Sequence, residues 1–275
     1  MAYQFKTLRV DIADKIAKVT LNRPEKKNAM SPQLHLDMAE CLEALRYDDE
    51  AAVVLITGAG NSFCAGMDLK EFFHELKGKK PGEYDRIGRI AIEWRGRTLR
   101  YYPKPTIAMV NGFTFGGAFG IVEGCDLAFA ADEAKFGLSE INFGMFPGGC
   151  VSKAISNIFR PRDALLYAMT GDTFDGKQAA AMGFVNAAYP LAHLETETMK
   201  WARKIAAKDP HGLKATKEAY RYSLEMTWDA AINYAGAKEQ EVFVAQKGGW
   251  VEGGIGDFVK GLYKPGLGAR PDGDK

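Results

Sequence analysis

The chain has 275 residues, of which 47% are hydrophobic, enough to bury the core of one large domain or of a domain with an appendage. Its 36 basic and 35 acidic residues leave a net charge of +1, which provides no general field for attracting nucleic acid or an anionic membrane. The N-terminus lacks a signal-peptide pattern, and no apolar run reaches the roughly 18 residues that cross a bilayer. We therefore expect a cytoplasmic protein without nucleic-acid or membrane partners.

Cysteine and histidine residues are few and scattered along the chain. The four cysteines form no CxxC pair, and the four histidines form no HExxH motif. Reduced thiols are therefore expected, and no local signature indicates a metal site. The sequence predicts a protein that holds no metal.

The N-terminal residues 7–21 alternate apolar and polar side chains on either side of a polar break, the period-two pattern of two paired strands. Ser31 and Pro32 then have the residue types of a helix N-cap and first turn, and apolar residues at helical spacing continue to about Arg46. A hairpin followed by an amphipathic helix is therefore expected at the start of the chain.

Four short apolar runs, each bounded by turn residues, follow along the chain at 52–58, 105–112, 125–131 and 184–190. Helical segments lie between most of them, and this alternation favours an α/β fold with parallel strands covered on both faces. From about residue 196 the pattern is helical, and the last residues are rich in glycine, proline and charge. We expect an α/β core over residues 1–195 and a helical region over 196–275 that ends in a loose tail.

Two of the turns after these strands present backbone amides rather than reactive side chains. Asp68, followed three residues later by Glu71, predicts a helix N-cap and places Met67 just before a set of unpaired amides. The segment from Gly116 to Ala118 also follows a strand and leads into an apolar helix, with nothing bulky to block a ligand. Two such turns can direct two N–H donors at one oxygen, which is an oxyanion hole. The alternative is two ordinary strand-to-helix connections whose glycines permit tight packing.

Glu140 is the only charged residue from Phe136 to Cys150, in a segment rich in apolar side chains. Desolvation by such neighbours raises the pKa of a carboxylate, so that it can accept and return a proton near neutral pH. Glu140 is therefore the candidate general acid and base, and the alternative is a side chain that points to solvent. Ser139 is either a substrate-positioning hydroxyl or a turn residue. Neither a GxSxG motif nor a histidine nearby in sequence indicates a nucleophile.

These segments give the chain a resemblance to the enoyl-CoA hydratase/isomerase (crotonase) superfamily over nearly its whole length. The matching motifs stand in the family's order and spacing: LNRPEKKNAMS, ITGAGNSFCAGMDL, KPTIAMVNGFTFGGAFG, CDLAFAADEAKFGLSEINFGMFPGG and TGDTFDGKQAAAMGFVN. Within the superfamily, the chain is most similar to the hydroxycinnamoyl-CoA (feruloyl-CoA) hydratase-lyases in SFCAGMDLKEFF, GLSEINFGMFPGG, TWDAAINYAGAK and the terminal KPGL.

The resemblance implies a fold and a site. The fold is a crotonase-like spiral of ββα units capped by C-terminal helices, usually assembled as a homotrimer or a dimer of trimers. The amides of Met67 and Gly117 would form the oxyanion hole for a thioester carbonyl, and Glu140 would be the catalytic glutamate. No cofactor is implied beyond coenzyme A as part of the acyl-CoA substrate. The nucleotide of coenzyme A would be held at Lys26, Ala65, Asp68 and Leu69.

The chain departs from the family pattern around the acyl group. Simple hydratases carry a second glutamate three residues after the oxyanion glycine, where this chain has Gly120, so one carboxylate must act alone. The hydratase-lyases carry tyrosines that bind the substrate's phenol, at positions where this chain has Phe72 and Gly236. The replacements indicate a roomier and more apolar acyl pocket, unless Met145 and Phe146 refill it. Its candidate substrate-binding residues are Phe72, Gly120, Ser139, Tyr234 and Gly236.

The implied function is that of a lyase for α,β-unsaturated acyl-CoA thioesters, which hydrates the enoyl double bond and then cleaves the product to an aldehyde and acetyl-CoA. The alternatives are an enoyl-CoA hydratase or isomerase for another bulky acyl group without cleavage, an acyl-CoA thioesterase, and a non-catalytic binding protein. The near-neutral charge argues against an RNA binder. The intact oxyanion motifs together with Glu140 argue against a protein that has lost its chemistry.

Overall fold

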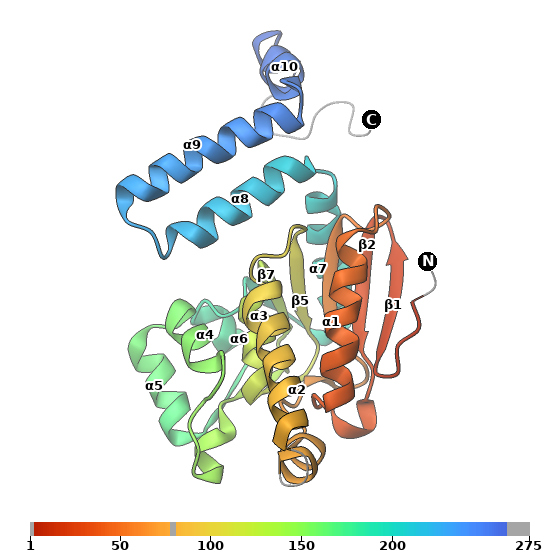
Figure 1. The fold of residues 1–275 in the computed structure, drawn as a ribbon, viewed down its shortest axis with the longest axis vertical. Coiled ribbons are helices and arrows are strands. Elements are labelled where there is room, and N and C mark those ends of the chain that lie inside the picture. The colour runs from red at the N-terminus through yellow and green to blue at the C-terminus, as the bar shows by residue number, and fades with distance from the viewer. Residues whose placement is uncertain (1–2, 78–80, 263–275) are drawn as a thin grey trace. The chain divides into compact units, whose positions relative to one another are not determined.

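The computed structural model describes residues 3–77 and 81–262 (Figure 1). The chain divides into two units, residues 1–206 and 207–275. The division expected between residues 195 and 196 falls inside helix α7 (Leu191–Ala206), which packs on β2, β3, β5, β7 and β10 and so belongs to the first unit. The tail predicted to be loose, with its KPGL motif, lies outside the described residues.

A six-stranded sheet runs through the first unit, in the order β1 (Leu8–Ala13), β2 (Ile16–Leu21), β3 (Val53–Gly58), β5 (Thr106–Val110), β7 (Leu127–Ala131) and β10 (Ala187–Tyr189). The first pair is the expected antiparallel hairpin, and both residues of its turn, Asp14 and Lys15, have positive φ. All other neighbours pair in parallel. Every residue of β3 and β5 is buried, which explains their continuous apolar sequences.

Four three-residue strands form a second sheet, in the order β4 (Ser62–Cys64), β6 (Phe113–Phe115), β8 (Lys135–Gly137) and β9 (Thr173–Asp175). The apolar runs did not predict these strands, because three residues are too few to show a period. β4, β6 and β8 each follow closely after a strand of the first sheet and precede helical segments. This repetition matches the spiral of ββα units that the family motifs implied.

Helices cover the sheets of the first unit (Figure 1). The first helix, α1 (Pro32–Arg46), begins where predicted, because Oγ of Ser31 accepts a hydrogen bond from the Leu34 amide at 3.2 Å. The others before α7 are α2 (Pro81–Glu93), α3 (Phe119–Gly124), α4 (Val151–Ile158), α5 (Pro161–Thr170) and α6 (Gly176–Ala181).

Five buried phenylalanines hold α3 in place. The ring centroids of Phe119, the first residue of α3, and Phe184 lie 4.9 Å apart, and those of Phe136 and Phe174 lie 5.3 Å apart. Phe159 joins the two pairs, 5.0 Å from Phe184 and 5.9 Å from Phe174. Aromatic pairs at these distances add packing energy beyond the area that they bury. The start of α3, next to the second amide-presenting turn, is therefore firmly anchored.

The second unit is helical, as predicted. It contains α8 (Pro210–Ser223), α9 (Trp228–Ala245), the π-helical segment η6 (Trp250–Ile255) and α10 (Gly256–Val259). Oδ1 of Asp209 caps α8 by accepting from the Gly212 amide at 2.7 Å, and it also accepts from Nε2 of Gln246, next to the end of α9, at 2.6 Å. Within residues 3–77 and 81–262, no helix combines the length and the apolar character that crossing a membrane requires.

Candidate active site

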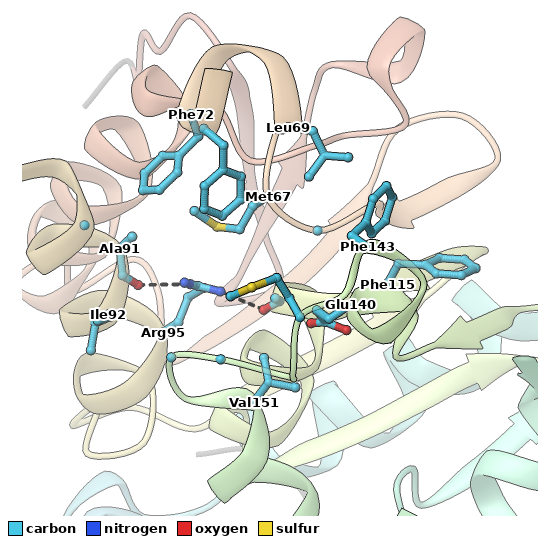
Figure 2. A pocket seen from close by; sticks show the side chains of 18 of the residues that line it. Met67, Leu69, Phe72, Ala91, Ile92, Arg95, Phe115, Glu140, Phe143 and Val151 are labelled. Carbon is cyan, nitrogen blue, oxygen red and sulfur yellow. Dashed lines mark hydrogen bonds between the residues drawn. The ribbon is translucent and has the colours of Figure 1, made fainter. Parts of the chain in front are cut away.

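A cavity of about 1250 Å³ lies in the first unit, among the segments 65–73, 84–95, 115–117 and 139–151 (Figure 2). Most of its wall is apolar. The predicted site residues that line this cavity are Met67, Gly117, Glu140, Ala65, Leu69, Phe72 and Ser139. Residues from four separate parts of the sequence therefore meet at one place.

The two amide-presenting turns lie against each other. β4 and β6, the strands before them, pair in parallel. Gly66 has a φ of +89°, and a Cβ built on it would lie 2.7 Å from the carbonyl oxygen of Phe115 and 3.6 Å from the amide nitrogen of Gly117. Only glycine allows this backbone conformation and this close approach. In the described part of the chain, the Met67 amide donates to no backbone carbonyl.

The second turn brings an amide and an acid together. Gly117 is the second residue of the 3-10 helix η4 (Gly116–Ala118), and amides in a first helical turn have no partner within the helix. Gly116 has a φ of +49°, and a Cβ built on it would lie 2.9 Å from Oε1 of Glu140. The carboxyl group of Glu140 therefore lies directly beside the turn that presents the Gly117 amide.

Glu140 lies in a second 3-10 helix, η5 (Ser139–Phe143), and its side chain lines the cavity (Figure 2). Oε2 is buried and has no hydrogen-bond partner among the described residues. Burial raises the pKa of Glu140, an effect that its own backbone amide partly offsets by hydrogen bonding. The carboxyl of Glu140 is therefore partly withdrawn from water, in a cavity whose wall is mostly apolar.

The raised pKa predicts how Glu140 affects stability. A carboxyl whose pKa is higher in the folded state stabilises the fold while it is protonated, and this stabilisation is complete below its unfolded pKa of about 4.3. The stabilisation is lost as the pH rises through the folded pKa. Glu140→Gln removes the buried charge, so we expect a higher melting temperature than that of the unchanged protein at pH 8 and an equal one near pH 4. Thermal unfolding followed by circular dichroism at both pH values tests this, and a variant that melts lower at pH 8 would contradict it.

Asp68 fixes the first turn through both of its carboxyl oxygens. Oδ1 accepts from the amides of Lys70 at 3.1 Å and Glu71 at 2.9 Å, which makes Asp68 the expected N-cap of the π-helical segment η2 (Leu69–Lys77). Oδ2 accepts from Arg23 at 3.0 Å. The capping box does not close, because the Glu71 carboxylate pairs with Arg23 at 2.5 Å. The Asp68 carboxylate is therefore occupied within the protein.

Removing this carboxylate is expected to loosen the turn. Asp68→Ala loses the cap and one partner of the largely buried Arg23, so we expect the free energy of unfolding to fall by about 2 kcal/mol. Chemical denaturation measures the change. Asp68→Asn, which keeps a capping oxygen, serves as the control and should lose less. Equal stability of Asp68→Ala and the unchanged protein would contradict the structural role.

Lys26 is not among the residues that line the cavity, and it is exposed in the 3-10 helix η1 (Pro24–Lys26), whose start follows strand β2. Tyr234 and Gly236 lie in α9 of the second unit, where the ring of Tyr234 meets that of Tyr222 edge-on at 5.3 Å. The parts that these three residues play in binding remain predictions.

The expectation of extra room at Gly120 is wrong. Gly120 is buried in α3, and a Cβ built there would lie 2.4 Å from Sγ of Cys150. The place that a larger residue at this position would take is thus filled by the Cys150 side chain. Phe72 is also tightly packed, with its ring 5.1 Å from that of Tyr84, which lines the cavity.

Sequence reasoning missed Arg95, which lines the cavity from the π-helical segment η3 (Trp94–Thr98). Its Nε donates to the carbonyl of Ala91 at 2.9 Å and its Nη1 to the carbonyl of Gly117 at 2.8 Å (Figure 2). The signal was its spacing: Arg95 stands four residues after Ala91 and eight after Ile87, both buried in α2. Helical spacing from two buried residues places a third on the buried face.

Comparisons with known proteins agree with this geometry. Residues 11–253 match the family described as enoyl-CoA hydratase/isomerase. A hydroxycinnamoyl-CoA hydratase-lyase of Pseudomonas fluorescens is 46% identical over 265 residues, 96% of each chain. A crystal structure of an enoyl-CoA hydratase from Mycobacterium smegmatis superposes with a TM-score of 0.84 at 26% identity, over 93% of this chain and 96% of that one. A crystal structure of an enoyl-CoA hydratase from Bacillus anthracis superposes with a TM-score of 0.84 at 26% identity, over 93% of this chain and 97% of that one. The resemblance seen in the motifs is confirmed, and the chain belongs to the enoyl-CoA hydratase/isomerase family.

Proposed function

We propose that the protein is a hydratase-lyase for α,β-unsaturated acyl-CoA thioesters. It adds water across the double bond and then cleaves the adduct to an aldehyde and acetyl-CoA. The observation that carries the proposal is the meeting of the Met67 turn, the Gly117 turn and the Glu140 carboxyl in one cavity. The identity to a protein named as a hydroxycinnamoyl-CoA hydratase-lyase supports the cleavage step.

Hydration uses the two amides and the single carboxylate. The thioester oxygen accepts hydrogen bonds from the Met67 and Gly117 amides, which stabilise the negative charge that develops there. Glu140 takes a proton from water as the water oxygen bonds to Cβ, and the electrons of the double bond move toward the thioester to form an enolate. Glu140 then returns the proton to Cα, giving a 3-hydroxyacyl thioester. The raised pKa of Glu140 suits a group that must both accept and donate.

Cleavage uses the same groups again. Glu140 removes the proton of the β-hydroxyl, the oxygen's electron pair becomes the carbonyl bond of the aldehyde, and the Cα–Cβ bond breaks. Its electrons form the enolate of acetyl-CoA, which the two amides hold. Glu140 finally protonates that enolate at Cα, so acetyl-CoA leaves and the carboxylate is restored.

The nucleotide of coenzyme A is proposed to lie along the first turn, against Ala65 and Leu69 and near Asp68, with Lys26 as a cation for its phosphates. The chain is proposed to assemble in the cytoplasm as a homotrimer or a dimer of trimers. Exposed apolar side chains on α5 support an assembly: Leu165 is 57%, Leu166 51% and Met169 71% exposed. Light scattering after size-exclusion chromatography tests the oligomer.

The direct test is product analysis. The purified protein is incubated separately with feruloyl-CoA, cinnamoyl-CoA and crotonyl-CoA, and the products are identified by mass. An aldehyde with acetyl-CoA from an aromatic substrate supports the proposal. A hydroxyacyl-CoA alone would support the second candidate, a hydratase without cleavage, which Phe72 favours because its side chain offers no hydroxyl to a phenol. Free coenzyme A with an unaltered acid would instead indicate a thioesterase.

A further inference from the structure

Arg95 is a buried cation to which the reaction described above assigns no role. Only 5% of the residue is exposed, and both of its hydrogen bonds go to backbone carbonyls. Its electrostatic neighbours are Cys150, Cys64 and His35, and in the described part of the chain it forms no ion pair with a carboxylate. Burying a guanidinium without a counter-ion is unfavourable unless a ligand provides one or supplies acceptors. Arg95 lines the cavity, and its remaining N–H groups make no hydrogen bond within the described residues.

The two glycines of the second turn locate this guanidinium. A Cβ built on Gly117 would lie 2.7 Å from Nη1 of Arg95, and one built on Gly116 would lie 2.9 Å from Oε1 of Glu140. Along the backbone, the amide nitrogen of Gly117 lies between the α-carbons of Gly116 and Gly117. The guanidinium and the carboxyl therefore flank the amide proposed to bind the thioester oxygen, and Figure 2 shows both side chains at the same cavity.

This location determines which part of a substrate Arg95 can reach. A thioester oxygen bound to the Gly117 amide holds its own carbonyl carbon there, and Cα and Cβ follow it directly. A cation beside that amide lies nearer to these first carbons than to the far end of a bulky acyl group. Gly120, which stands where simple hydratases carry a second glutamate, is close to the same side chain, since a Cβ built on it would lie 4.0 Å from Cβ of Arg95.

We propose that Arg95 is a further catalytic residue, which donates hydrogen bonds to the oxygen at Cβ of the substrate. The proposal rests on the hydratase-lyase function. That oxygen belongs in turn to the attacking water, the β-hydroxyl and the departing aldehyde. An arginine keeps its proton, so Arg95 acts only as a donor. It stabilises the negative charge that develops on the β-oxygen when Glu140 removes the hydroxyl proton and the Cα–Cβ electrons pass into the acetyl-CoA enolate. One carboxylate can then act without a second.

Binding measurements test the contact without turnover. In the Glu140→Gln variant, calorimetry compares 3-hydroxy-3-phenylpropanoyl-CoA with 3-phenylpropanoyl-CoA, which lacks only the β-hydroxyl. We expect the hydroxylated ligand to bind about tenfold more tightly, since a hydrogen bond from a charged donor is among the stronger ones. Adding Arg95→Met should abolish the difference, whereas adding Arg97→Met should keep it. Arg97 lies on the same segment, is exposed and pairs with Glu93. Equal weakening of both ligands by Arg95→Met would overturn the proposal.

Turnover gives a second and independent readout. Arg95→Met should lower kcat about 100-fold on cinnamoyl-CoA and feruloyl-CoA alike, with little change in KM. Added guanidinium should partly restore Arg95→Ala but not Glu140→Gln, a rescue that a purely structural role would not show. An effect confined to KM and to one acyl group would instead assign Arg95 to the acyl tail. If the unchanged protein converts no enoyl thioester, the proposed function fails, while the binding comparison still decides the role of Arg95.

Discussion

Glu140→Gln is expected to lower kcat by about 10³-fold on any enoyl thioester that the protein converts. Glutamine keeps the size of the side chain but can neither accept nor return a proton, and positioned acid–base groups typically contribute about 10²- to 10⁴-fold. Here the same carboxyl serves several proton transfers, so the expected loss lies well above the lower end of that range. Because glutamine preserves shape, the affinity for coenzyme A should change little. Steady-state kinetics and calorimetry with coenzyme A measure the two effects separately.

The matched control is Glu40→Gln, an exposed glutamate on α1 away from the cavity, which should keep full activity. Glu140→Gln with activity within about threefold of the unchanged protein would refute the assignment of Glu140 as acid and base. Loss of coenzyme A binding together with activity would point to a disturbed cavity instead, and circular dichroism of the variant distinguishes that case.

The hairpin of the first sheet and the first helix could be predicted because each shows a repeating local pattern. The alternation over residues 7–21 and the apolar spacing after Ser31 each extend over several residues, and the structure places the hairpin and α1 where they were expected. The second sheet has no such pattern, since its strands are three residues long. The end of the first unit was also missed, because the helical sequence of α7 does not reveal that α7 packs on the first sheet.

The candidate site shows the same contrast: local patterns could be predicted, whereas contacts between distant parts of the sequence could not. Met67 and Gly117 could be named as candidates because each belongs to a local turn motif, and Glu140 because it stands alone in an apolar segment. The filling of the space at Gly120 depends on Cys150, which is thirty residues away in the sequence. Arg95 likewise acquires its significance only by contact with Gly117. Contacts of this kind arise from packing between elements, so the pattern of residues within one segment does not predict them.

Gly66→Ala is expected to lower kcat/KM by about 100-fold or more. A Cβ at this position would stand 2.7 Å from the Phe115 carbonyl oxygen, which is backbone and cannot rotate away, and the φ of +89° is unfavourable for alanine. The Met67 turn must therefore shift away from the Gly117 turn, and the two amides no longer point at one oxygen. Misplacing one donor of an oxyanion hole typically costs about 10²- to 10³-fold. Kinetics with a converted enoyl-CoA measure the loss.

Comparing Gly66→Ala with Gly183→Ala distinguishes the effect of backbone strain from the effect of displacing the amides. Gly183 has a similar φ of +80°, but a Cβ there would meet nothing within 4 Å, and the residue is not part of the cavity wall. Both variants should therefore lose stability through strain. Only Gly66→Ala should lose activity, because only this variant displaces the Met67 amide. Because the oxyanion hole acts more strongly on the enolate than on bound substrate, the loss should appear in kcat more than in KM. Equal activity of the two variants would mean that the Met67 amide is not one of the two donors.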